Sequence, residues 1–348
     1  MKFDKVLSIE TSCDDTSIAI VRHDGYVLAQ SSANQDLHHK DFGGIVPEIA
    51  GRNHSIQVLP LVMSCLEKAN LTWDDIPGIA VTNRPGLMGS LLVGVVTAKT
   101  LSLTKKIPYI GINHLEGHLL APFLKDDRFS PPENFNYPYV ALAVSGGHSQ
   151  IYLVKEFGQY QILGKTIDDA AGEAFDKFAK MVGLGFPGGA VVDKMAKQGD
   201  IKKYNYPRPM IREKTINMSF SGLKAAAKRQ IEKMDPEVIK SECANLCASY
   251  QEAIVDVLMA KLKLAIKQVG KINGVVLTGG VSANSRLRST AEAWANEVGL
   301  TLAVPPIRYC TDNAAMIGYA GVKRLNLGEV STQELAPSPK VYPGDFLV

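Results

Sequence analysis

Apolar and polar positions along the first part of the chain form short β runs and longer helical stripes. Turn-forming residues such as Asp14, Asp15 and Gly25 separate the first runs. The pattern predicts three strands, a helix, a strand, a helix, a strand and a helix. These elements cover residues 6–10, 17–21, 27–31, 52–69, 78–82, 89–104, 109–113 and a helix from 114 onward.

The second half repeats this order. Its predicted elements cover residues 139–145, 150–155, 159–165, 169–182, 274–278, a helix from 284, 301–304 and a helix from 312, with an inserted region and a long helix at 241–269 before the fourth strand. Such a repeat indicates an internal duplication. We expect two α/β domains of related topology, at 1–135 and 136–348, with a helical insertion in the second and a cleft between them. In such sheets, ligands bind beyond the carboxyl ends of strands.

Composition agrees with two globular domains. The chain has 348 residues, of which 46% are hydrophobic and 21% charged, and its net charge of +3 neither establishes nor excludes nucleic-acid binding. No secretory signal and no membrane-spanning apolar run is visible, and the odd number of five cysteines fits a reduced, cytoplasmic protein. Cys243 and Cys247 lie one helical turn apart among apolar residues, where core packing is expected.

Two of the seven histidines, His114 and His118, lie one turn apart at the start of a predicted helix. That spacing places both imidazoles on one face, where they suit a single transition metal, although a surface or capping role is the alternative. The order is His-x-Glu-Gly-His rather than the His-Glu-x-x-His of zinc proteases. In the repeat, Asp312 occupies the position equivalent to His114. If the two halves face each other, Asp312 is the natural third ligand, with a helix N-cap as its alternative role.

Three glycine-bearing turns are candidate phosphate-binding elements, which we expect to follow strands. They are Ser145-Gly146-Gly147, Gly279-Gly280 with Asn284 at the following helix start, and Pro187-Gly188-Gly189 with Asp193 nearby. Backbone amides of such turns form anion nests, but a glycine pair is also an ordinary hairpin turn.

Two acidic segments add candidate polar contacts. The run from Asp168 to Lys177 opens a helix, where acids ordinarily complement the helix dipole, but Asp176 lies further in and suits a ribose hydroxyl. Residues 10–16 place three acids and three hydroxyls between two strands, more than a hairpin turn requires.

One segment is both basic and aromatic, with Lys202, Lys203, Tyr204, Tyr206, Arg208, Arg212 and Lys214. It fits either a solvated loop or an RNA-facing patch that combines phosphate contacts with base stacking.

Seven motifs in order give the chain a close resemblance to a known family. They are Glu-Thr-Ser-Cys-Asp at 10–14, His-Leu-Glu-Gly-His at 114–118, Val-Ser-Gly-Gly-His at 144–148, Asp-Asp-Ala-Ala-Gly-Glu-Ala-Phe-Asp-Lys at 168–177, Ser-Phe-Ser-Gly-Leu-Lys at 219–224, Gly-Gly-Val-Ser-Ala-Asn at 279–284 and Cys-Thr-Asp-Asn at 310–313. Over essentially its whole length the chain resembles the bacterial tRNA threonylcarbamoyladenosine transferases, the TsaD family, related to Kae1. The resemblance implies two duplicated RNase H-like domains of the actin, hexokinase and heat-shock-70 (ASKHA) superfamily with an interdomain cleft.

The resemblance also implies an activity: transfer of a threonylcarbamoyl group from threonylcarbamoyl-AMP to N6 of adenosine 37 in tRNAs that read codons beginning with adenine. It implies one divalent metal ion, Fe²⁺ or Zn²⁺, held by His114, His118 and Asp312. The matching substrate-binding positions are Ala143, Val144, Ser145, Gly146, Gly147, Asp176, Gly189, Asp193 and Asn284. Glu10, Asp14 and Asp15 match the loop near the reacting group, and Asp15 stands where many relatives carry Glu.

The implied partners are tRNA, a paralogous ASKHA subunit (TsaB) and a P-loop ATPase subunit (TsaE), with no membrane. The exposed face of helix 52–69 is the candidate docking surface, and core packing is the competing role for its apolar residues. Three other classes compete: an ASKHA-type small-molecule kinase, a metalloprotease, and a non-catalytic tRNA-binding subunit. The kinase is not expected to carry paired histidines, and the protease needs a different glutamate spacing.

Overall fold

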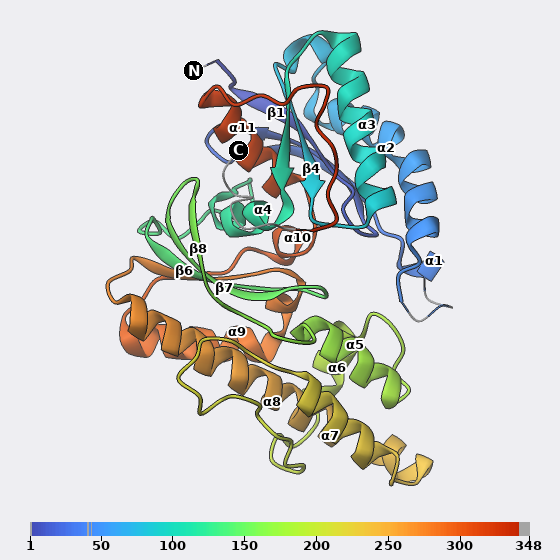
Figure 1. Ribbon diagram of the computed structural model, residues 1–348, viewed down its shortest axis with the longest axis vertical. Coiled ribbons are helices and arrows are strands. Elements are labelled where there is room, and N and C mark those ends of the chain that lie inside the picture. Colours follow the sequence, from blue (N-terminus) through green and yellow to red (C-terminus); the bar gives the residue numbers. More distant parts are fainter. Residues whose placement is uncertain (1, 40–41, 43, 341–348) are drawn as a thin grey trace. The chain divides into compact units, whose positions relative to one another are not determined.

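Two five-stranded mixed sheets of the same topology form the framework of the chain (Figure 1). The computed structural model describes residues 2–39, 42 and 44–340 and divides the chain into two units. In each sheet the first three strands are antiparallel, and the fourth and fifth continue parallel to the first. The predicted duplication is therefore confirmed, and so is the order of its strands.

The first unit contains one sheet and the helices that cover its two faces. Its strands, in the order β3-β2-β1-β4-β5, are β1 (Lys5–Glu10), β2 (Thr16–Arg22), β3 (Val27–Ala33), β4 (Ile79–Arg84) and β5 (Tyr109–Asn113). Its helices are α1 (Asp36–His39), α2 (Pro47–Ala69), η2 (Trp73–Asp75), α3 (Met88–Lys105), α4 (His114–Leu120), η3 (Ala121–Phe123), α10 (Ile307–Cys310) and α11 (Ala314–Asn326).

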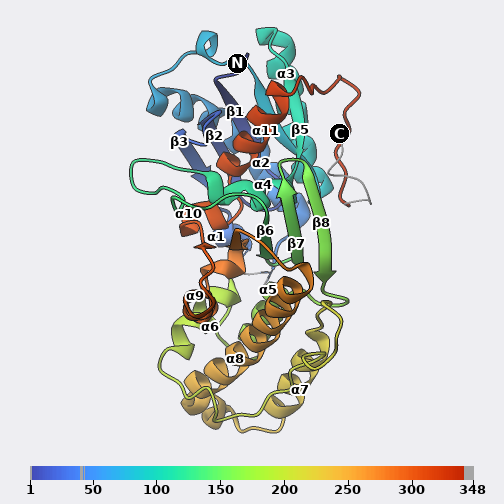
Figure 2. The ribbon, with the colours of Figure 1, turned by 90° about the vertical axis from the view of Figure 1, so that its left-hand side faces the viewer.

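Alternation along the strands places different helices on the two faces of this sheet. Leu7 and Ile9 of β1 point into a core shared with Val58 of α2 and Val95 of α3. Ser8 points the other way, and its hydroxyl donates to the carbonyl of Ala314 at the start of α11 (2.7 Å). Figures 1 and 2 show α2 and α3 along one face and α11 across the other.

The second unit is built in the same way with more helices. Its sheet has the order β10-β9-β6-β7-β8, and its strands are β6 (Tyr139–Val144), β7 (Ser149–Glu156), β8 (Gln159–Lys165), β9 (Gly274–Thr278) and β10 (Leu302–Ala303). Its helices are α5 (Ala171–Met181), α6 (Gly188–Ala196), α7 (Ser221–Ile231), α8 (Pro236–Val269), η4 (Gly280–Ala283) and α9 (Ser285–Val298). Among these, α6 and α7 lie in the region that the sequence pattern left as an insertion. The core includes Cys243 and Cys247, as expected.

The unit boundaries differ from the expected domains at the carboxyl end. The chain leaves the first unit after Pro131, close to the expected boundary at residue 135, but it returns to that unit at Pro305. Residues 136–348 therefore do not form one domain. The physical reason is the fit of α11 against the first sheet. Gly318 and Gly321 allow an approach so close that a Cβ atom would lie 2.7 Å from Val21 and 2.3 Å from Ala80. Within the described residues, every helix falls short of the length and apolarity that a membrane span requires.

A buried ion pair ties α4 to α11. Arg324 donates through Nε and Nη2 to the two oxygens of Glu116, at 2.8 Å each, and through Nη1 to Glu329 at 2.6 Å. The side chains of Arg324 and Glu116 are 4% and 1% exposed. This pairing gives Glu116, the acid between the two histidines, a role in joining two helices.

Breaking this pair from one side is expected to destabilise the first unit strongly. Arg324→Met should lower the free energy of unfolding by about 3–5 kcal/mol, because the carboxylate of Glu116 would remain buried without its partner. Urea denaturation measures the change. The exposed pair between Arg22 and Asp24 provides the matched control, since Arg22→Met should cost under about 1 kcal/mol. Equal losses in both variants would contradict this reading of the buried pair.

Candidate metal centre and acidic loop

Helix α4 presents His114 and His118 on one face directly after β5. Asn113 starts the helix by accepting a hydrogen bond from the amide of Leu115 at 2.9 Å. The two imidazole rings lie 4.6 Å apart between centroids and meet edge to face. Both rings are buried, so a ligand that they share would be largely shielded from water.

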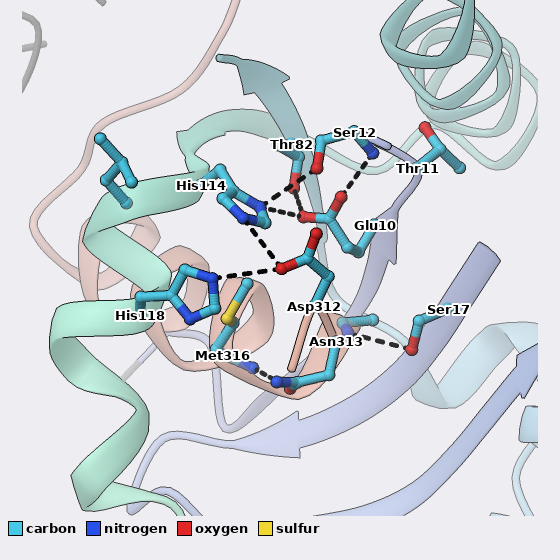
Figure 3. Close-up of polar contacts among 12 residues, drawn as sticks. Glu10, Thr11, Ser12, Ser17, Thr82, His114, His118, Asp312, Asn313 and Met316 are labelled. Atoms are coloured by element: carbon cyan, nitrogen blue, oxygen red, sulfur yellow. Dashed lines mark hydrogen bonds and ion pairs between the residues drawn. The ribbon is translucent and has the colours of Figure 1, made fainter. Parts of the chain in front are cut away.

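Asp312 completes a group of three candidate ligands. Its Oδ1 lies 3.2 Å from Nε2 of His114 and 3.2 Å from Nε2 of His118, as Figure 3 shows. The helix N-cap expected as its alternative role belongs to the next residue, Asn313, whose side chain accepts from the amide of Met316 at 3.0 Å. The repeat predicted that Asp312 would reach the histidines from the opposite domain. All three candidate ligands belong to the first unit, and Asp312 reaches the histidines through the packing of α11.

Glu10 accepts a hydrogen bond from His114 on the side of the ring that faces away from Asp312. Its carboxylate accepts from the Ser12 amide (2.5 Å), the Thr82 hydroxyl (2.5 Å) and Nδ1 of His114 (3.0 Å) (Figure 3). Because a carboxylate can only accept, Nδ1 of His114 carries a proton and donates it to Glu10, and this contact turns Nε2 towards Asp312. The side chain of Glu10 is fully buried, and its contact with His114 favours a role in orienting this candidate ligand.

The donor set fits a divalent metal ion. Burial disfavours a charged imidazole, but Asp312 and Glu10 outweigh it and hold the pKa of His114 well above its usual value. Burial likewise opposes ionisation of Asp312, but His114 and His118 hold its pKa well below its usual value. The three ligating atoms all lie within 4.8 Å of one another. Ligands at about 2.1 Å from a tetrahedral ion stand about 3.4 Å apart, close to the separations observed.

The acidic loop joins β1 to β2 beside this group. Burial, then the charge of Asp14 and that of Asp312, raise the pKa of Asp15 to about 7. Burial and Asp312 also raise the pKa of Asp14. Since the charge of Asp312 acts on both carboxyls, the loop lies close to the candidate metal centre. One amide restrains it, because Nδ2 of Asn34 donates to Asp15 at 2.8 Å.

In the second unit, the structure brings the first two glycine turns together at strand ends. The turn after β6 is closed by the amide of Ser145, which donates to the carbonyl of His148 at 2.7 Å. Gly172 of α5 approaches it so closely that a Cβ atom would lie 2.5 Å from the carbonyl oxygen of Ser145. Gly279, with φ +83°, packs equally closely against the carbonyl of Val144. The third turn, around Gly188, joins α5 to α6 and does not follow a strand as expected.

The predicted polar side chains of this unit hold helix starts. Asp176 accepts from the amide of Gly188 at 2.8 Å, and Asp193 accepts from the amide and hydroxyl of Ser285 at 3.1 and 2.8 Å. Asn284 caps α9 through the amide of Leu287 (3.0 Å) and donates to Gln251 (2.6 Å). A Cβ atom at Gly189 would meet open space.

The basic and aromatic segment does not present its tyrosines for stacking. Tyr206 is buried edge to face against the stacked rings of Phe178 and Tyr250, and the hydroxyl of Tyr204 donates to Glu242. Arg208 pairs with Asp256 at 3.0 Å. The exposed basic side chains of the segment are Lys202, Lys203, Arg212 and Lys214. The RNA-stacking alternative is therefore wrong for Tyr206, because the core of the second unit uses its ring.

Fold and site together define an α/β protein of two duplicated units, with the fold type of the actin, hexokinase and heat-shock-70 class and a candidate metal centre in its first unit. Structural neighbours support the class. The HypF protein of T. kodakarensis has a TM-score of 0.63 at 12% identity and covers 96% of this chain and 49% of that chain. The (R)-2-hydroxyglutaryl-CoA dehydratase component A of Acidaminococcus fermentans has a TM-score of 0.53 at 15% identity and covers 92% and 99%. At such identities the likeness concerns the fold alone.

Sequence comparison then gives the family. The model of the TsaD family, tRNA N6-adenosine threonylcarbamoyltransferase, matches residues 26–319. A relative of that name from Bdellovibrio bacteriovorus is 60% identical over 343 residues, which cover 99% of each chain. Another from Thermosipho africanus is 46% identical and covers 97% of this chain and 99% of that protein. The chain belongs to the TsaD family of transferases.

Glu10 is expected to set the strength of metal binding through His114. In the wild type, one oxygen of Glu10 accepts from the Ser12 amide and the other accepts from His114. Glu10→Gln has only one acceptor oxygen, so either His114 or the Ser12 amide loses its partner. The affinity for Zn²⁺ should fall about 10–100-fold. Competition with a chromophoric chelator measures it, and Glu67→Gln, at an exposed position on α2, is the matched control. Unchanged affinity in Glu10→Gln would show that the buried carboxylate is not needed to orient the ligand.

Asp15 is expected to make the metal-free protein less stable at high pH. Because its pKa is raised to about 7, the folded chain keeps a proton that the unfolded chain releases at about pH 4. The free energy of unfolding therefore falls as pH rises through this window. Asp15→Asn should raise it by about 2 kcal/mol at pH 8 and change it little at pH 4.

Urea denaturation of chelator-treated protein at the two pH values tests this sign. Asp74→Asn, at an exposed position of the same unit, is the control and should show no such pH-dependent difference. A destabilising effect of Asp15→Asn at pH 8 would contradict the expectation.

Proposed function

We propose that this chain transfers the threonylcarbamoyl group of threonylcarbamoyl-AMP to N6 of adenosine 37 in tRNAs that read codons beginning with adenine. AMP is the second product, and the modified nucleoside is threonylcarbamoyladenosine. Membership in the TsaD family supports the transfer. The observation that carries the proposal is the approach of Asp312 to both His114 and His118, next to a loop with two carboxyls.

The reaction is an acyl transfer in which one bond forms and one breaks. The exocyclic N6 of adenosine forms a bond to the carbamoyl carbon, the bond from that carbon to the phosphate oxygen of AMP breaks, and N6 loses a proton. The lone pair of N6 is delocalised into the purine ring, so the amine is a weak nucleophile. Orientation and electrostatic stabilisation must therefore supply much of the rate enhancement. The adenosine must leave its stack to react.

The acidic loop provides the groups that act on the amine. Asp14 or Asp15 orients N6 and accepts its proton as the new bond forms. A carboxyl with a pKa of about 7, as Asp15 has, is a stronger base than an ordinary aspartate. Glu10 supports the reaction indirectly, by fixing His114.

The second unit provides the residues for the adenylate. Amides of the turn that follows β6 suit the phosphate, and we assign Ala143, Val144, Ser145, Gly146 and Gly147 to this role. Gly189 leaves space for the nucleoside, and Asp176, Asp193 and Asn284 line the helix starts around it. We propose that both groups of residues act on the same adenylate.

One divalent ion per subunit completes the centre, and His114, His118 and Asp312 would hold it. Two imidazoles and a carboxylate suit both Fe²⁺ and Zn²⁺. When bound, the ion supplies Lewis acidity and a template for a phosphate or acyl oxygen of the adenylate.

Partners are proposed from the family and from an exposed apolar stripe on α2. The inner face of α2 is buried at Val58, Val62 and Cys65, as core packing predicts, whereas the outer face exposes apolar side chains. Ile56, Leu59 and Met63 are 67%, 53% and 60% exposed. We propose that this outer stripe binds the paralogous subunit TsaB, and that the ATPase TsaE and tRNA act on the assembled protein in the cytoplasm.

A single incubation tests the function. The protein, loaded with Zn²⁺ or Fe²⁺ and supplied with its two partner subunits, is mixed with threonylcarbamoyl-AMP and unmodified tRNA, and the digested nucleosides are analysed by mass spectrometry. Threonylcarbamoyladenosine is the expected product. Phosphorylation of a small molecule, or cleavage of a peptide, without this nucleoside would favour the kinase or the metalloprotease instead.

His114→Ala should reduce this transfer by at least about a hundredfold and remove the bound metal, because the chelate loses one of three ligands. Circular dichroism should show an unchanged fold. His23→Ala, which replaces a histidine of the same unit outside the centre, should keep both metal and activity. Full activity of His114→Ala without metal would refute the assignment of the centre.

A further inference from the structure

His54 is a buried histidine that neither the metal centre nor the adenylate site uses. It lies in α2, and its imidazole is 0% exposed. Nε2 lies 3.0 Å from the carbonyl oxygen of Cys13, and Nδ1 lies 2.7 Å from the hydroxyl of Thr16. The two contacts fall immediately before Asp14 and immediately after Asp15, so one side chain holds the chain on both sides of the two aspartates.

The contacts determine the protonation state of the ring. A carbonyl oxygen can only accept, so Nε2 carries the hydrogen and donates to Cys13. Nδ1 then accepts from the hydroxyl of Thr16. Burial lowers the pKa of His54, in agreement with a neutral imidazole. With one hydrogen bond given and one received, both ring nitrogens are satisfied, which is what a fixed structural clamp requires.

We propose that His54 is a positioning residue that holds Asp14 and Asp15 in place beside the candidate metal centre. The effect of His54 on transfer rests on the proposed function of the loop. The two hydrogen bonds that hold the loop are independent of that function.

The loop needs such a clamp because its carboxyls repel one another. The charges of Asp14 and Asp312 both act on Asp15, in a buried setting where repulsion is weakly screened. Opening the loop towards water would relieve this repulsion. Among the described residues outside the loop, the side chains of Ser90 and Asn34 also bond to residues 13–15: the hydroxyl of Ser90 donates to the carbonyl of Cys13 (3.1 Å), and Asn34 donates to Asp15.

The clamp has a rigid base. One turn after His54, Val58 is buried in the core of the first unit together with Ile9 and Ile18, which belong to the two strands that the loop connects. His54 therefore projects from a helix that is packed against the same strands, and its position relative to the loop is fixed.

The test compares three variants of the full chain. His54→Leu fills part of the space without hydrogen bonds, and His54→Gln keeps one donor and one acceptor. Val58→Ala weakens the packing of the same helix without touching the loop, and is the matched control. Hydrogen exchange of a peptide spanning residues 11–17 is followed by mass spectrometry, together with Zn²⁺ affinity and the kcat and KM of transfer.

His54→Leu should speed exchange in this peptide at least tenfold and lower kcat at least tenfold, with KM for the adenylate and Zn²⁺ affinity within about twofold of the wild type. His54→Gln should recover most of both losses, and Val58→Ala should change neither exchange in the peptide nor kcat beyond about twofold.

Two results would overturn the proposal: unchanged exchange in His54→Leu, or an equal effect in Val58→Ala. If the wild type itself shows no transfer, the function proposed above fails, while the exchange experiment still decides the role of His54.

Discussion

The close packing of α11 on the first sheet is the constraint on which the candidate centre depends. Gly318 and Gly321 let the helix approach the strands to a distance that any side chain would prevent. Asp312 precedes this helix by two residues, so the same packing that buries α11 brings the carboxylate to the histidines of α4. The ion pair between Arg324 and Glu116 joins the two helices a second time. Two ligand-bearing segments that are far apart in the sequence, His118 and Asp312 being 194 positions apart, are thereby held to one geometry.

Electrostatics around the centre is unbalanced in favour of negative charge. Glu10, Asp14, Asp15 and Asp312 gather within or beside one buried group, where the imidazoles of His114 and His118 offset part of their charge. The raised pKa values of Asp14 and Asp15 and of His114 are two consequences of the same crowding. A divalent cation would reduce both, because it replaces the proton shared between His114 and Asp312 and attracts the acidic loop. The protein therefore presents a site whose own carboxylates favour a cation.

Much of this architecture follows from the sequence, because the signals are periodic. Short apolar runs predicted the ten strands of the described residues, and the spacing of His114 and His118 predicted their common helix face. The return of the chain to the first unit has no periodic signal in the sequence, since it depends on how closely Gly318 and Gly321 of α11 fit against the first sheet. The role of Glu10 was likewise hidden: its position after a strand is known from sequence, but its burial and its contact with His114 are not. Tyr206 shows the same limit, because an aromatic residue in a basic loop looks identical whether it faces RNA or the core.

Helix α2 connects the two kinds of surface in the first unit. Its inner face contributes Val58 to the core and His54 to the acidic loop, and its outer face exposes Ile56, Leu59 and Met63. Because α2 is packed along one side against the strands that the loop connects, the imidazole keeps its position at the loop while the outer side chains remain exposed. The two hydrogen bonds of His54 are 3.0 and 2.7 Å long, so they require this fixed position: a movement of the imidazole by about 1 Å would break them. One helix thus serves two separate roles: its inner side holds the acidic loop, and its outer side is the surface proposed for the partner subunit.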